Sequence, residues 1–234
     1  MNALTDNLST ADALTGSVMD RTVLESPEGG AGLLYPRTAG GVALSAFGVG
    51  ISAASLSFAN AHVVDPATGG FFVPVALGTG ALALLTGGLW EFRAGRMFSG
   101  TFGVIYAGFL LSTGLIIQFF AGPAATAAGG DGLGDALGAY LLLWCAVTAL
   151  LTICAAKLDW PAFLAFLFLA LALLFGGLAN VVGIAPGNTG DLLNRIGGWC
   201  GIVDAVIAFY LGASILLADL HGRAILPAPA VLRS

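Results

Sequence analysis

Long apolar runs, each bounded by a short polar stretch, dominate the pattern along the chain. A helix that crosses the core of a bilayer contains about 20 mostly apolar residues. Six runs reach that length, over residues 40–60, 71–91, 99–121, 136–156, 160–183 and 197–218. They are rich in Leu, Ala and Phe and lack the alternation of apolar and polar residues that marks the strands of a membrane β-barrel. The pattern therefore predicts an all-α membrane protein with six transmembrane helices.

Polar and helix-breaking residues separate these runs. The third break is expected to be a Gly/Ala/Pro loop with Asp131 and Asp135, and the fifth is expected to extend from Pro186 to Arg195. The other breaks contain His62 and Asp65-Pro66, then Glu91, Arg93 and Arg96, and then Lys157 to Asp159. We expect residues 36–226 to form the transmembrane domain, residues 1–35 a flexible acidic cytoplasmic tail, and residues 227–234 a short cytoplasmic C-terminal tail.

The composition excludes several classes of protein. Charged residues make up only 9% of the chain and hydrophobic residues 58%, whereas a soluble domain carries about 25% charged residues. A nucleic-acid-binding protein needs a basic surplus, but the net charge is −5. The sequence contains no phosphate-binding loop, zinc signature or nucleophile elbow, and its three cysteines lack the spacing of metal ligands. We therefore expect no enzymatic activity, no cofactor, no metal site and no nucleic-acid partner.

The basic residues predict the orientation in the membrane. Six crossings place both termini on the same side, together with the breaks near residues 92–98 and 157–159. That side holds seven of the eight Lys and Arg residues, and Arg195 is the eighth. Because cytoplasmic loops carry the excess of Lys and Arg, both termini are expected in the cytoplasm and the chain in the cytoplasmic (inner) membrane.

Three polar residues lie within or at the ends of the predicted spans, where each costs free energy unless it is satisfied. Asp204 is either a protonatable site on a permeation path or a structural hydrogen-bonding group to a neighbouring helix or subunit. Asn180 shares a helical face with Leu169, and that face suits either a narrow path or an ordinary helix contact. Glu91 lies beside Arg93, and a solvated pair at the membrane interface is the simplest interpretation.

Small residues recur in the last predicted span. Gly197, Gly201 and Ala205 are spaced by four residues and form a stripe on one helical face. Such a stripe either lets two helices approach closely or forms part of a pore wall.

The stretch Gly88-Leu-Trp-Glu-Phe-Arg-Ala-Gly-Arg-Met-Phe98, followed by Tyr106-Ala-Gly-Phe109, resembles a signature of the acetate uptake transporter family. Trp199-Cys-Gly201, Tyr210 and Gly222-Arg-Ala-Ile-Leu-Pro227 resemble later motifs of the same family. The resemblance covers residues 38–229 with six matching spans. It implies a homohexamer in the lipid bilayer, each protomer a six-helix pore similar in architecture to the urea channels.

The resemblance also implies a function and a set of pore residues. Family members move acetate and, in some cases, lactate, other small monocarboxylates or the dicarboxylate succinate, together with a proton. Their pore is narrowed by three apolar or aromatic side chains, which correspond here to Phe47, Tyr106 and Leu169. Substrate or proton contacts are expected at Asn180, Asp204 and Glu91.

The chain departs from the family pattern at the segments expected to hold the substrate and the cytoplasmic gate. Thr38-Ala-Gly-Gly-Val-Ala-Leu44 replaces the family's N-P-A-P-L-G-L, and Gly95-Arg-Met-Phe98 replaces G-N-T-F. Asp204 also lies outside the usual pattern. Three hypotheses follow: a transporter of small monocarboxylates, a channel for small neutral solutes such as urea, amides or ammonia, and a membrane scaffold that transports nothing.

Overall fold

The computed structural model describes residues 40–227. The expected tail over residues 1–35 lies outside the described residues, as does nearly all of the expected C-terminal tail. The regular structure of residues 40–227 is entirely helical, as the apolar runs predict. The helices are α2 (Val42–Asn60), the 3-10 helix η1 (Pro66–Phe71), α3 (Phe72–Val75), the π-helix η2 (Ala76–Ala81), α4 (Leu82–Arg93), α5 (Met97–Leu115), the π-helix η3 (Ile116–Phe120), α6 (Ala121–Ala155), α7 (Trp160–Val182) and α8 (Thr189–His221).

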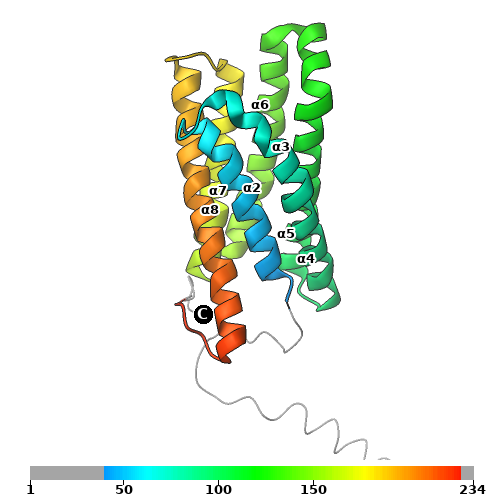
Figure 1. Ribbon diagram of the computed structural model, residues 1–234, viewed down its shortest axis with the longest axis vertical. Helices are drawn as coiled ribbons and strands as arrows, with labels where there is room; N and C mark the ends of the chain where they lie inside the picture. The colour runs from blue at the N-terminus through cyan, green and yellow to red at the C-terminus, as the bar shows by residue number, and fades with distance from the viewer. Residues whose placement is uncertain (1–39, 228–234) are drawn as a thin grey trace, which may run out of the picture. The chain divides into compact units, whose positions relative to one another are not determined.

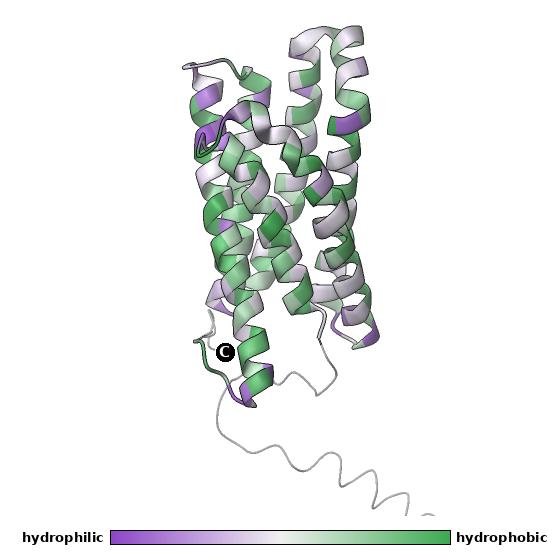
Figure 2. Ribbon diagram, in the orientation of Figure 1, coloured by the Kyte–Doolittle hydropathy of each residue, from purple (hydrophilic) through white to green (hydrophobic). Residues whose placement is uncertain are grey.

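The long helices run alongside one another (Figure 1). Helix α2 packs against α4 and α8, α7 packs between α6 and α8, and α4 packs against α5. Apolar residues cover most of the helix length, and strongly polar residues gather near the two ends of the helices (Figure 2). Within the described range, five continuous helical stretches are long and apolar enough to cross a membrane: Val42–Asn60, Pro66–Arg93, Met97–Ala155, Trp160–Val182 and Thr189–His221.

The longest of these stretches, Met97–Ala155, folds back on itself at Gly129. The Tyr140 hydroxyl lies 2.9 Å from Thr113 Oγ1, although a straight helix would separate residues 27 positions apart by about 40 Å. Gly129 is the only residue of α6 with non-helical angles, at φ 80° and ψ 170°. Side chains rarely tolerate that conformation, which glycine adopts freely. The residues before Gly129 therefore run antiparallel to those after it (Figure 1).

The loop expected around Asp131 and Asp135 is wrong, because both residues lie in α6. Four of the seven residues from Pro123 to Gly129 are alanines, and alanine has the highest helix propensity of any residue. The two helices consequently extend to the reversal, and Gly129 alone makes the turn.

The break expected from Pro186 to Arg195 is shorter in the structure, since α8 begins at Thr189. Asn188 caps this helix: its side-chain oxygen accepts a hydrogen bond of 2.8 Å from the N–H of Asp191, the usual role of Asn before a first turn. Arg195 therefore lies in α8 rather than in a loop. Helix α7 is capped in the same way by Asp159, which accepts from Ala162 at 2.8 Å. Burial raises the pKa of Asp159, and the Ala162 hydrogen bond opposes that shift.

Candidate functional site

A cavity of about 110 Å³ lies among the helices, between α2, α3, α5, α6, α7 and α8. It is smaller than the cavity of about 150 Å³ that binds benzene in an engineered protein, so it suits a solute of few heavy atoms. Most of its walls are apolar, and none of the described residues that line it is charged. Its polar side chains are those of Ser52, Ser57, Asn60, Tyr106, Thr113 and Asn194.

The structure brings two of the three expected pore residues, Tyr106 and Leu169, to this cavity. Phe47 does not line it. Nine residues, or two and a half helical turns, separate Phe47 from the cavity-lining Leu56, so the two side chains lie on opposite sides of α2. The Phe47 ring instead packs near α8, with its centroid 6.3 Å from that of Phe209.

Tyr106 is 1% exposed, and its hydroxyl is hydrogen-bonded to that of Thr148. The Thr148 hydroxyl has one proton, which it donates to the Trp144 carbonyl over 2.6 Å. Tyr106 must therefore be the donor in its bond to Thr148. The lone pairs of its oxygen remain available as hydrogen-bond acceptors.

An aromatic cluster continues from Tyr106 toward the start of α5. The Phe102 ring lies 5.0 Å from that of Tyr106 and 4.8 Å from that of Phe166, and Phe98 packs edge-on against Phe166 at 5.6 Å. Sequence reasoning did not single out Phe102 or Phe166, and it named Phe98 only as part of a family-like motif. The spacing of four residues from Phe98 through Phe102 to Tyr106 places them on one face of a helix, and this signal identifies two of the three.

The expected face of α7 reaches the cavity only in part. Leu169, Leu173 and Gly176 line the cavity. Asn180 is not among the lining residues; its amide donates to the carbonyl of Gly176 at 2.8 Å. This hydrogen bond stays within its own helix, next to the cavity wall.

The small-residue stripe of α8 lies both at the cavity wall and at a close contact with α7. Gly197 and Gly201 line the cavity, and a Cβ added to Gly197 would lie 3.2 Å from the Ala172 carbonyl oxygen of α7. Asp204 follows one turn after Gly201 on a neighbouring part of the same face. It is 1% exposed, and its Oδ2 has no hydrogen-bond partner in the described part of the chain.

The structure contradicts the solvated Glu91–Arg93 pair. Glu91 is fully buried, and its carboxylate accepts hydrogen bonds from the Gly41 N–H at 2.6 Å and from Arg96 Nη2 at 2.6 Å, with a second ion-pair contact from Arg96 Nε. Arg93 lies over the Trp90 ring instead. Glu91 is not a cavity residue: it fastens the start of α2 to the turn between α4 and α5.

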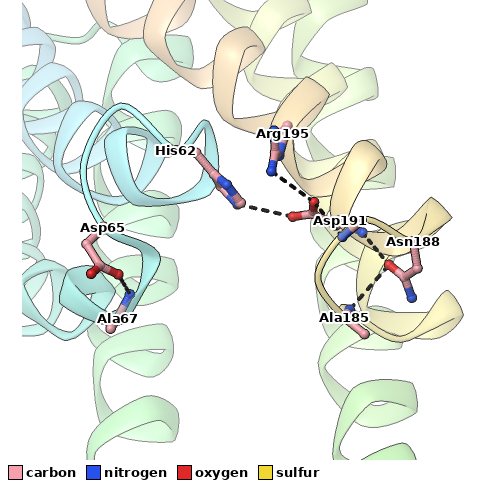
Figure 3. A network of polar contacts seen from close by, with 8 residues as sticks. His62, Asp65, Ala67, Ala185, Asn188, Asp191 and Arg195 are labelled. Carbon is pink, nitrogen blue, oxygen red and sulfur yellow. Dashed lines mark hydrogen bonds and ion pairs between the residues drawn. The ribbon is translucent and has the colours of Figure 1, made fainter.

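A polar network joins residues that are close in sequence to Asn60 and Asn194, which line the cavity. Figure 3 shows Asp191 between His62 and Arg195, with distances of 3.1 Å from its carboxylate to His62 Nε2 and to an Arg195 guanidinium nitrogen. This network ties the segment after α2 to the first turns of α8. Sequence reasoning missed it because His62 and Asp191 are far apart in the chain and share no motif.

Comparison with known proteins extends the description. The model of the GPR1/FUN34/yaaH family matches residues 33–229. Ammonia transport outward protein 2 of Saccharomyces cerevisiae is 34% identical over 156 residues, which cover 66% of this chain and 53% of the yeast protein. Acetate permease A of Emericella nidulans is 29% identical over 143 residues, covering 59% of this chain and 48% of the permease. The chain spans about half the length of these two relatives.

A solved structure, described as that of the bacterial acetate channel SatP, shares the fold. Its TM-score is 0.70 at 23% sequence identity, covering 82% of this chain and 99% of the channel. At this level of identity the likeness establishes the architecture alone.

Proposed function

The chain belongs to the GPR1/FUN34/yaaH family, and from this premise we propose that it carries acetate and similar small monocarboxylates across a membrane. The family match confirms the resemblance found in the sequence. The observation that carries the proposal is the small, uncharged cavity bounded by Tyr106 and Leu169 within the helices. Its size suits a solute such as acetate, and its place among apolar helices suits a path through a bilayer.

The walls of the cavity favour a neutral solute. Moving an isolated carboxylate into an apolar environment is very costly, and none of the described lining residues supplies a positive charge. A monocarboxylate therefore crosses together with a proton, as the undissociated acid. The free lone pairs of Tyr106 suit this form, because a carboxylic acid has an O–H to donate and a carboxylate has none.

The topology in our proposal has six crossings. The reversal at Gly129 divides the stretch Met97–Ala155 into two antiparallel helices, which raises five continuous stretches to six. With six crossings, the distribution of basic residues favours a protein of the inner membrane with both termini on the cytoplasmic side. A homohexamer with one pore in each protomer follows from the family resemblance and completes the proposal.

Uptake of labelled acetate into proteoliposomes tests this function. We expect uptake above that of protein-free vesicles, stimulated by an inward proton gradient and inhibited by unlabelled propionate but not by urea. Subtraction of the lipid background is essential, because undissociated acetic acid crosses bilayers unaided. If no proton gradient produces uptake above that of protein-free vesicles, the proposal is refuted.

A channel for small neutral solutes is the second candidate. The uncharged lining favours it, and one relative is named for ammonia transport. Flux of ammonia or urea through the same vesicles, with no protein-dependent acetate flux, would select this alternative.

Substitutions at the cavity wall test the proposed constriction. Leu169→Ala removes a side chain that lines the cavity, so we expect several-fold faster acetate uptake and a new permeability to larger monocarboxylates. Phe47→Ala is the matched variant, because its ring lies on the other side of α2, and we expect it to leave uptake near the wild-type rate. An equal increase in uptake in the two variants would instead show that Phe47 forms part of the constriction, as the family resemblance implies.

A further inference from the structure

Asp204 is a carboxyl group enclosed in the middle of a membrane helix. It lies far from both ends of α8, which extends from Thr189 to His221, and it is 1% exposed. An ionisable residue at such a depth is costly, and where it occurs it usually has a partner or a function.

Within the described residues, the helices packed against α8 offer Asp204 no cation to pair with. Helix α8 packs mainly against α2 and α7, and neither Val42–Asn60 nor Trp160–Val182 contains an acidic, basic, His, Cys or Tyr residue. The Asp204 Oδ2 atom has no hydrogen-bond partner within residues 40–227. A buried carboxylate without a partner becomes neutral by binding a proton.

Asp204 does not itself line the cavity, but it follows the cavity-lining Gly197 by seven residues, about two helical turns, and so shares its face of α8. Tyr106 of α5 is the titratable side chain among the described residues that line this cavity. Tyr106 already donates its proton to Thr148, so it can only accept from this side. Ser52 of α2 adds a buried hydroxyl at the cavity that also lacks a partner among the described residues. Tyr106 and Ser52 at the cavity wall, and Asp204 on the face of α8 that carries Gly197, thus leave hydrogen-bonding capacity unused.

We propose that Asp204 holds a proton beside the cavity and that its carboxyl group donates this hydrogen bond to the carboxyl group of the passing solute. This inference rests on the proposed transport of monocarboxylates and assigns the polar end of that site. The neutral Asp204 supplies a donor where Tyr106 supplies an acceptor, and the two together match the C=O and O–H of a carboxylic acid. Ionised Asp204 has no proton to donate to the C=O of the acid, so the path conducts only while Asp204 is protonated.

The proposal predicts a distinct dependence on pH. Acetate uptake is measured in proteoliposomes for the wild type and for Asp204→Asn at a series of pH values, and the ratio of the variant rate to the wild-type rate is taken at each pH. The ratio cancels the falling fraction of undissociated acetic acid, which is the same for both proteins. Because the amide introduced by Asp204→Asn is a permanent neutral donor, we expect a ratio near one in acidic buffer that rises by up to about tenfold per pH unit once Asp204 ionises.

Two variants control this experiment. Asp219→Asn makes the same substitution at an exposed position of the same helix and is expected to keep a constant ratio to the wild type. Asp204→Glu restores a titratable group and is expected to restore the pH dependence. A ratio for Asp204→Asn that stays constant across the pH series would overturn the proposal.

Infrared spectroscopy separates this inference from the proposed function. A protonated carboxyl group has a C=O stretching band that a carboxylate lacks, and we expect this band in wild-type protein at neutral pH and its loss in Asp204→Asn. Absence of the band in the wild type would refute the protonated Asp204 even where acetate is transported. Absence of acetate uptake with the band present would instead refute the proposed function, and with it the role of Asp204 toward a solute.

Discussion

Glu91→Ala is expected to destabilise the protein by about 3–5 kcal/mol, the usual cost of removing one partner from a buried ion pair. The carboxylate is fully buried and is bonded both to the Gly41 N–H and to the Arg96 guanidinium. Its removal leaves the positive charge of Arg96 without this counter-charge in a poorly solvated place. The start of α2 also loses its attachment to the turn after α4. Thermal unfolding in detergent, followed by circular dichroism, measures the loss.

A double variant shows that the effect comes from the pair. Replacing both members of a buried ion pair with apolar residues is often nearly neutral, so Glu91→Leu combined with Arg96→Met is expected to recover much of the stability lost in Glu91→Ala. Asp135→Ala provides the control, because Asp135 is an exposed acid on α6. Unfolding of Glu91→Ala at the wild-type temperature would show that the Glu91–Arg96 pair contributes nothing to stability.

The sequence predicts the helical fold well because its strongest signal is long-range hydropathy. An apolar run of about 20 residues has few stable alternatives to a membrane helix, and each predicted run overlaps a helix of the structure. The helix ends were harder to predict. Asn188 and Gly129 decide where α8 begins and where α6 bends, but Gly and Asn are common within the expected loops as well, so their presence did not reveal these roles.

Side-chain pairing was predicted least well, and Glu91 illustrates the reason. Arg93 is nearer in sequence, yet Arg96 forms the ion pair because the turn through Gly95, at φ 75°, brings the chain back toward Glu91. The polar network of His62, Asp191 and Arg195 depends on the meeting of two distant segments. Periodicity along one helix contains no information on either contact.

In the candidate site, too, positions along one helix were predictable from the sequence and contacts between helices were not. Leu169, Leu173 and Gly176 could be placed on one face from their spacing alone, and all three line the cavity. The same helical geometry puts Phe47 and Leu56 on opposite faces of α2. Only the structure shows that the face with Leu56 is the one that lines the cavity. Asp204 was recognisable in the sequence as a buried acid. The absence of a cation opposite it on α2 and α7 became apparent only once those helices were known to be its neighbours.

Helix α5 places Tyr106 at the cavity. Its close packing against α4 depends on Gly103 of α5 and Gly88 of α4. A Cβ added to Gly103 would lie 2.6 Å from Gly88 Cα and 2.9 Å from the Leu84 carbonyl oxygen. These are backbone atoms, which cannot move aside as a flexible side chain can. A Cβ at Gly108 of the same helix would meet no atom within 4 Å. Replacing each glycine with alanine therefore compares the same substitution at a crowded position, Gly103, and at an open one, Gly108.

Gly103→Ala is expected to destabilise the protein by about 1–3 kcal/mol, because overpacking forces the backbones of α4 and α5 apart. Gly108→Ala is expected to have no effect or to stabilise by up to about 1 kcal/mol, since alanine is the better helix former. Thermal unfolding of both variants in the same detergent measures the difference in sign. Acetate uptake at a temperature where both remain folded shows whether displacement of α5 also disturbs Tyr106, and we expect slower uptake in Gly103→Ala alone. Equal stability of the two variants would mean that α4 and α5 do not approach as closely as Gly88 and Gly103 indicate.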